Sequence, residues 1–114
     1  MSFEILGTGH YVPSRIVTNE ELSAFLDTSD EWISRRVGVK QRHVCTTETA
    51  AELACRAAVN ALEMSGTAPE ELDMILCATV SGDDVSPSMS CTVQGMLGAG
   101  CPDFLRAARS RRCW

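Results

Sequence analysis

Three side chains of the kinds that bind nucleotides recur at intervals of four residues. They are Thr28, Trp32 and Arg36, and on an α-helix this spacing places them along one side. The indole offers a flat stacking surface, and the guanidinium can contact a phosphate through two parallel hydrogen bonds. The row therefore suits a ligand with an aromatic ring and phosphates. The alternative is that Trp32 is a packing anchor, as tryptophan often is, and that Arg36 pairs with a nearby acid.

A second candidate for nucleotide binding is the segment Gly7-Thr-Gly9-His-Tyr-Val12. It resembles a dinucleotide fingerprint, but the third glycine is missing, and Pro13 stands where the helix that holds the pyrophosphate should run. The pattern favours a tight turn at the end of a strand, in which the glycines relieve steric strain.

The six cysteines and two histidines do not have the spacing of a metal site. No C-x-x-C pair occurs, and Cys55 and Cys77 fall inside otherwise apolar segments, where a free thiol behaves as a small hydrophobic group. No secretion signal opens the chain. We therefore expect reduced thiols, and neither disulfides nor a bound metal.

The elements that must position the Thr28–Trp32–Arg36 row are two short helices. Thr18-Asn-Glu-Glu21 has the pattern of a capping box and predicts a short helix with Leu22, Phe25 and Leu26 on one face. Thr28-Ser-Asp-Glu31 repeats the pattern and predicts a second helix, which ends at Gly38 and buries Ile33 and Val37.

The rest of the chain alternates between apolar strand-like segments and helices. Strands are expected at 3–6, 39–44, 74–80 and 103–107, and helices at 47–65 and from an N-cap at Ser86 to 97. The run at 74–80 is apolar without alternation, as in a strand covered on both faces. This order predicts the α/β class, with helices layered on a sheet.

Composition bounds the remaining possibilities. With 114 residues, 45% hydrophobic and 22% charged, the chain has the size and composition of one folded domain. No apolar run is long enough to cross a bilayer. The first 104 residues hold all 15 acidic residues but only six of the ten basic ones, so we expect no nucleic acid and no membrane among the partners. A cytoplasmic protein is the expectation.

Several blocks in the chain together resemble the start of 3-oxoacyl-[acyl-carrier-protein] synthase III. These are Ile5 to Pro13, Thr18-Asn19, Asp27-Thr-Ser-Asp-Glu-Trp-Ile33, Arg42-His43, Ala78-Thr79, Ser86-Pro-Ser88, Gln94-Gly-Met-Leu-Gly98 and Cys101-Pro-Asp-Phe104. The resemblance implies part of a thiolase-like layered α/β fold, the truncated N-terminal half. We therefore expect residues 1–104 to form a partial thiolase-like N-terminal domain, and residues 105–114 a divergent Arg-rich tail.

The resemblance also implies an activity and its partners. The family condenses an acyl-CoA primer with a malonyl-acyl carrier protein to a 3-oxoacyl-acyl carrier protein, with loss of carbon dioxide, and its members form homodimers. Acyl-CoA is a substrate, and no tightly bound cofactor is implied. The family's adenine-stacking tryptophan falls on Trp32, and neighbouring coenzyme A contacts fall on Thr28 and Arg36. For these three residues, the resemblance favours the binding role over the packing role.

The resemblance breaks at the residue expected to carry the chemistry. Ser110 stands at the position of the family's nucleophilic cysteine, and a hydroxyl needs a placed general base that a thiolate does not. The family's catalytic histidine and asparagine belong to its second half, and neither His10 nor His43 matches them. We therefore expect a truncated chain with no intact catalytic set, inactive by itself. The alternative is a non-catalytic module that binds coenzyme A or another anion.

Overall fold

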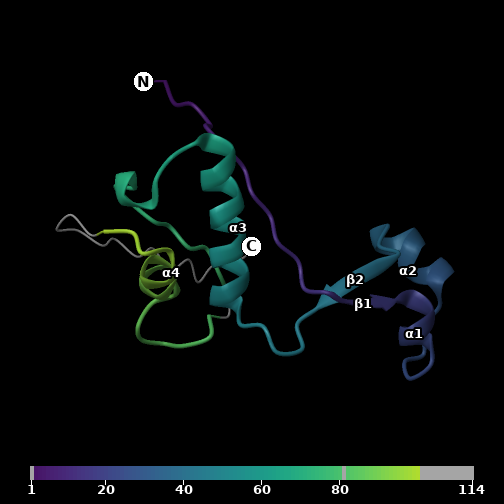
Figure 1. Cartoon of the computed structure of the whole chain (residues 1–114). Coiled ribbons are helices and arrows are strands. Elements are labelled where there is room, and N and C mark those ends of the chain that lie inside the picture. Colours follow the sequence, from purple (N-terminus) through teal and green to yellow (C-terminus); the bar gives the residue numbers. More distant parts are fainter. Residues whose placement is uncertain (1, 81, 101–114) are drawn as a thin grey trace. The chain divides into compact units, whose positions relative to one another are not determined.

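The computed structural model describes residues 2–80 and 82–100 (Figure 1). It divides into two compact units. One is Val12–Glu48, and the other takes in the described residues of 1–11 and 49–114. The predicted boundary between residues 104 and 105, the predicted strand at 103–107 and Ser110 lie outside the described residues.

The unit Val12–Glu48 is built on an antiparallel pair of strands. β1 (Arg15–Thr18) pairs with β2 (Gln41–Val44), so that Ile16 stands opposite His43. The helices α1 (Asn19–Ser23) and α2 (Asp30–Val37) fill the chain between the strands. The structure confirms the strand expected within 39–44, whereas β1 lies outside all the strands expected from the sequence.

Helix α1 is shorter than its sequence pattern predicts. The Thr18 hydroxyl caps it by accepting the Glu21 N–H at 3.2 Å, but the Glu21 carboxylate pairs with Arg15. The helix ends at Ser23, so Phe25 and Leu26 lie beyond it and the helical face predicted for them with Leu22 is wrong; both side chains are exposed. Their amides instead bond back to the carbonyl of Leu22 in a turn.

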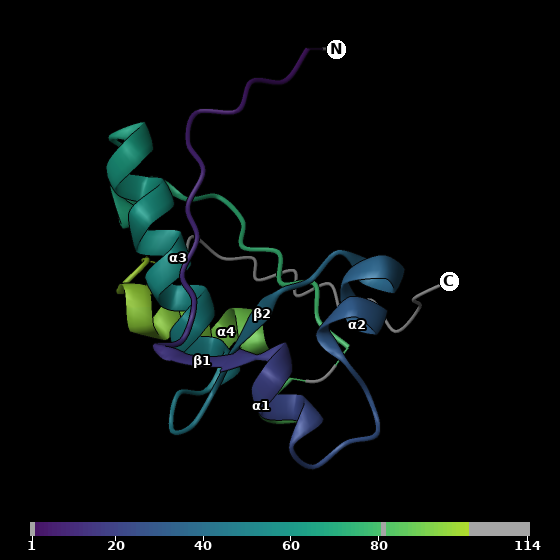
Figure 2. The same ribbon diagram turned by 90° about the vertical axis from the view of Figure 1, so that its right-hand side faces the viewer.

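The other unit is organised around α3 (Ala50–Ser65). Thr49 and Glu52 form a reciprocal capping box at its start, and Gly66 ends it with a φ of 67°. The structure thus confirms the helix within 47–65. An extended segment of residues 2–11 runs beside α3 (Figure 2), where the Asn60 side chain donates to the His10 carbonyl at 2.9 Å.

Gly7 and Gly9 allow this close approach, and the tight turn predicted for them is wrong. A Cβ on Gly9 would lie 2.1 Å from the Ala57 carbonyl oxygen, and one on Gly7 would lie 2.5 Å from that of Ala61. Neither glycine has a positive φ, so the requirement is space against the helix backbone.

A short 3₁₀ turn, η1 (Pro69–Glu71), and the helix α4 (Met89–Leu97) complete this unit. Helix α4 packs on α3 and buries Val93 and Ser90. Its N-cap is Ser88, which has extended backbone angles, so the N-cap predicted at Ser86 is wrong: the chain bends at residues 85–87 before the helix begins at Met89. The predicted end of the helix at residue 97 is confirmed, with Gly98 as its C-cap at a φ of 65°.

Residues 3–6 and 74–80 form no strand within the described part of the chain, contrary to prediction. They carry large exposed side chains, among them Phe3 (91% exposed) and Leu76 (64%). Strands need a hydrogen-bonded neighbour, and the described residues pair only β1 with β2.

The helices of the described residues were also compared with the length and hydrophobicity of a membrane span, and none of them meets both requirements.

Candidate functional site

Helix α2 carries the central residue of the predicted row. The Ser29 hydroxyl caps it by accepting the Trp32 N–H at 3.2 Å, and Gly38 ends it at a φ of 72°. Acidic residues lie in its first turn and Arg35 and Arg36 in its last, which matches the helix dipole. The cap is therefore Ser29, and the capping position predicted at Thr28 is wrong by one residue.

The buried side of α2 consists of Ile33, which is 9% exposed. The prediction that Val37 shares this burial is wrong, because Val37 is 66% exposed in the last turn of the helix. A single apolar side chain thus anchors the helix to its unit.

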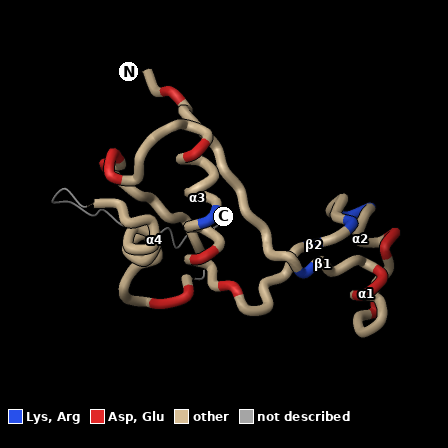
Figure 3. The backbone as a smooth tube through the Cα atoms, in the orientation of Figure 1, with Lys and Arg blue, Asp and Glu red and all other residues tan. Residues whose placement is uncertain are grey.

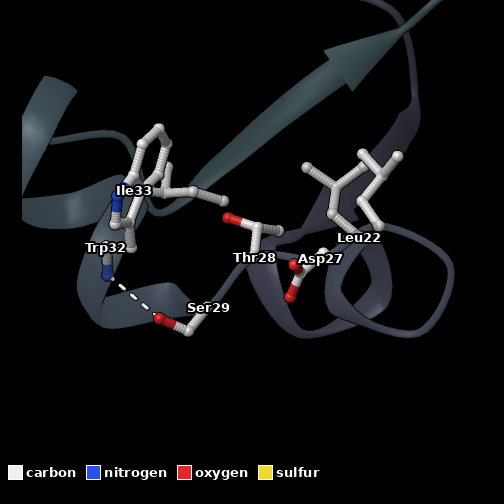
Figure 4. A pocket seen from close by; sticks show the side chains of 7 residues that line it. Leu22, Asp27, Thr28, Ser29, Trp32 and Ile33 are labelled. Atoms are coloured by element: carbon white, nitrogen blue, oxygen red, sulfur yellow. Dashed lines mark hydrogen bonds between the residues drawn. The ribbon is translucent and has the colours of Figure 1, made fainter.

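A groove of about 690 Å³ lies along α2 (Figure 4). Its lining combines apolar side chains with two hydroxyls and one carboxyl group; the residues are Leu22, Leu26, Asp27, Thr28, Ser29, Trp32 and Ile33. Figure 4 shows the Thr28 hydroxyl directed towards Ile33 and the indole of Trp32.

The Thr28 hydroxyl is a buried polar atom that makes no hydrogen bond to any described residue. A buried hydroxyl without a partner destabilises a fold by about 1–3 kcal/mol, so such atoms are rare and often mark a place where another molecule supplies the partner. Since Thr28 lines the groove, its oxygen fits a ligand with a polar edge.

A second, smaller hollow of about 280 Å³ also borders Trp32. Arg35 and Arg36 line it together with Glu31, and Figure 3 shows basic positions gathered on α2. The Arg36 guanidinium carbon lies 5.7 Å from the centroid of the indole, within the range of a cation–π contact.

The groove and the basic hollow share the lining residues Ser29 and Trp32. Trp32 lines both, Thr28 only the first and Arg36 only the second. Trp32 is 59% exposed, so its role as an interior packing anchor is wrong. The alternative in which Arg36 pairs with a nearby acid is also wrong for the described residues, because Arg36 forms no ion pair with any of them.

Asn19 connects the segments around this site. In the sequence it stands out only by its place after a capping threonine and in the Thr18-Asn19 block. The side chain is 2% exposed and bonds to Asp30, Val39 and Arg42. The bond from Asn19, followed by that from Lys40, lowers the pKa of the Asp30 carboxyl below its usual 3.8.

The remaining candidates do not line the groove. His43 donates from Nδ1 to the Pro13 carbonyl at 2.6 Å, a structural contact within its unit. Cys45, Cys55, Cys77 and Cys91 are free thiols, and burial raises the pKa of Cys77. The described residues hold no cluster of His, Cys, Asp and Glu that could bind a metal ion.

The groove and the hollow can hold a ligand, but the described residues that line them offer no thiol or imidazole. Their polar groups are hydroxyls, carboxyl groups and guanidinium groups around one exposed aromatic ring. Such a set stacks, hydrogen-bonds and neutralises charge. The arrangement is therefore suited to recognition.

Comparison with known proteins identifies the relatives of this chain. It is 51% identical over 98 residues to "Beta-ketoacyl-[acyl-carrier-protein] synthase III" of Clostridium acetobutylicum, which covers 86% of this chain and 30% of that protein. No family model matches the chain. The chain spans about a third of the length of the curated relatives that it matches.

Solved structures show the same relationship. The chain superposes on 3-oxoacyl-[acyl-carrier-protein] synthase III from Aquifex aeolicus VF5 with a TM-score of 0.82 and 41% identity, covering 92% of this chain and 34% of that one. The priming β-ketosynthase from the R1128 polyketide biosynthetic pathway gives a TM-score of 0.81 at 32% identity, covering 92% and 32%. These matches confirm the predicted α/β class and the thiolase-like fold.

Proposed function

We propose that this chain, a homologue of β-ketoacyl-[acyl-carrier-protein] synthase III, binds the nucleotide end of a coenzyme A thioester through Thr28, Trp32 and Arg36. The observation that carries the proposal is the exposed indole of Trp32, which lines both a groove with an unpartnered hydroxyl and a hollow lined by arginines. An adenine nucleotide has the matching parts, namely a flat ring, polar ring edges and phosphates.

Each of the three side chains has its own part in this binding mode. The adenine stacks on the indole, whose large face favours offset stacking. The Thr28 hydroxyl, which lacks a partner among the described residues, bonds to a polar edge of the ring. The Arg36 guanidinium binds a phosphate, and its planar fork favours two parallel hydrogen bonds.

The parent reaction is the condensation of an acyl-CoA primer with a malonyl-acyl carrier protein, with release of carbon dioxide, in fatty-acid or polyketide biosynthesis. Acyl-CoA enters as a substrate, so the reaction needs no separate bound cofactor, and the carrier protein and a second copy of the chain are the proposed partners. Similarity to synthase III relatives supports this assignment.

Calorimetry with coenzyme A tests the binding proposal. The full chain should bind coenzyme A saturably, and Trp32→Ala should weaken binding by about fivefold to 150-fold, because stacking on an aromatic ring contributes about 1–3 kcal/mol. Phe25→Ala is the matched control, since Phe25 is an exposed aromatic residue of the same unit that does not line the groove. Equal affinity in the Trp32→Ala variant would contradict the proposal.

The chain acting alone should not catalyse the condensation, because Ser110 replaces the expected nucleophilic cysteine. It would then act as a non-catalytic module that binds coenzyme A. Incubation with acetyl-CoA and malonyl-acyl carrier protein distinguishes catalysis from binding alone. Formation of 3-oxoacyl product would contradict the non-catalytic role, and coenzyme A binding without product would support it.

A further inference from the structure

We infer that Asn19 is the positioning residue of the proposed coenzyme A site: its buried side-chain amide joins both ends of α2 and thereby fixes Trp32. The inference rests on the proposed function. Asn19 does not line the groove or the hollow, so it would act on the ligand only through the helix.

The Asn19 side chain donates two hydrogen bonds to the two ends of α2. One runs from Nδ2 to Oδ1 of Asp30, the first residue of the helix, at 2.7 Å. The other runs from Nδ2 to the carbonyl oxygen of Val39, directly after the helix C-cap, at 2.8 Å. One amide nitrogen thus connects the entry and the exit of an eight-residue helix.

The carbonyl oxygen of the same side chain ties α2 to the strands. Oδ1 of Asn19 accepts a hydrogen bond from Nη2 of Arg42 in β2 at 2.6 Å, while the Asn19 backbone N–H donates to the Lys40 carbonyl at 3.3 Å. The side chain uses both of its N–H groups and its oxygen. Aspartate, which has almost the same shape, lacks the two donors when ionised.

Helix α2 depends on this amide because little else holds it in place. Its buried apolar surface comes from Ile33, whereas Val37 and Trp32 are largely exposed. With one apolar anchor, packing leaves the rotation of the helix about its axis weakly determined, and a fully bonded polar group can specify it. Rotation of α2 would move the indole out of the groove wall.

The nearby ion pair cannot replace the amide. Lys40 and Asp30 are 3.0 Å apart, but their side chains are 71% and 38% exposed, and ion pairs in contact with water contribute little to stability. By contrast, Asn19 is 2% exposed, so its hydrogen bonds are shielded from competing water.

The test uses the full chain in a Trp114→Phe background, which leaves Trp32 as the sole tryptophan. In Asn19→Ala we expect a more mobile indole, measured as lower Trp32 fluorescence anisotropy, and an affinity for coenzyme A lower by about tenfold. Far-ultraviolet circular dichroism shows whether the helices remain.

Two control variants separate positioning from general effects. Asn60→Ala removes the other asparagine, whose side chain holds the His10 carbonyl in the other unit, and should change neither readout. Lys40→Met removes the ion pair but keeps the amide, and should leave Trp32 anisotropy unchanged.

A folded Asn19→Ala protein with unchanged Trp32 anisotropy overturns the inference, whatever its melting temperature. If Asn19→Ala does not fold, Asn19→Asp keeps the contact with Arg42, removes both donors and should give the same loss. If neither variant folds, hydrogen exchange is measured in the unaltered chain. The side-chain amide protons of Asn19 should exchange more slowly than those of Asn60, and equally fast exchange contradicts the inference. The anisotropy of Trp32 is measured without ligand and therefore tests the positioning role by itself. Absence of coenzyme A binding by the unaltered chain would refute the proposed function and leave the anisotropy result unaffected.

Discussion

The guanidinium carbon of Arg36 lies 5.7 Å from the centroid of the Trp32 ring, one helical turn away along α2. The two side chains thus make a continuous surface of aromatic ring and positive charge. Because Arg36 forms no ion pair within the described residues, its charge is available to an incoming anion.

This relationship predicts that Arg36 recognises phosphate and that lysine cannot replace it fully. Arg36→Lys should weaken coenzyme A binding by about fivefold to tenfold, because an ammonium loses the planar fork and stacks less well on the ring. Binding of adenosine, which has no phosphate, should change little. Calorimetry with both ligands checks this.

The matched control is Arg56→Lys. Arg56 also lies beside an aromatic ring, that of Tyr11, at 4.8 Å, but in the other unit. An equal loss of affinity in both lysine variants would show a general effect of replacing arginine by lysine, and would contradict a specific role of Arg36 in binding phosphate.

The contact between Gly9 and α3 predicts opposite effects of alanine at two glycines. Gly9→Ala would put a Cβ 2.1 Å from the Ala57 carbonyl oxygen, so the segment must shift, at a cost of about 1–3 kcal/mol of unfolding free energy. Gly95→Ala, inside α4 with nothing within 4 Å, should stabilise the chain by about 0.5–1 kcal/mol. Urea denaturation of both variants measures the difference, and a stabilised Gly9→Ala would show that the close approach is absent in solution.

The Asp83 carboxylate should stabilise α3 from a distant loop. Its two oxygens accept the backbone N–H groups of Ala50 and Ala51 at 2.9 and 2.8 Å. Asp83→Ala leaves these first-turn amides without that acceptor and should lower the unfolding free energy by about 1 kcal/mol or more. The neighbouring exposed Asp84→Ala should have little effect. Thermal unfolding followed by circular dichroism compares them, and equal melting temperatures would contradict the capping role.

The lowered pKa of Asp30 predicts an acid-dependent stability of the unit Val12–Glu48. Hydrogen bonds from Asn19 and Lys40 favour the ionised carboxyl in the folded state, so folding is favoured while Asp30 is charged. This contribution is complete above the ordinary value of 3.8 and disappears as the pH falls through the lowered folded-state pKa.

Carbon-13 NMR titration of the Asp30 carboxyl measures this directly. Lys40→Met should move its pKa back towards 3.8 in part, since the bond from Asn19 remains. A carboxyl group that titrates at or above the ordinary value would contradict the hydrogen bonds that the structure places there.

Local sequence determined the helices and where several of them end. The capping box of Thr49 and Glu52, and the glycines at positions 38, 66 and 98, act through neighbours within one helical turn. For that reason they can be read from residue order. The four-residue spacing likewise identified Trp32 and Arg36 as neighbours.

Tertiary structure decided what depends on residues far apart in the chain. Strand β1 exists because β2 supplies its hydrogen bonds, Gly9 is needed because α3 passes beside it, and Asp83 caps a helix that begins 33 residues earlier. The exposure of Trp32 and the joining role of Asn19 also follow from packing and hydrogen bonds between elements. The spacing of residues along one helix does not predict which face of the helix is buried, because the residues that bury it come from other elements of the fold.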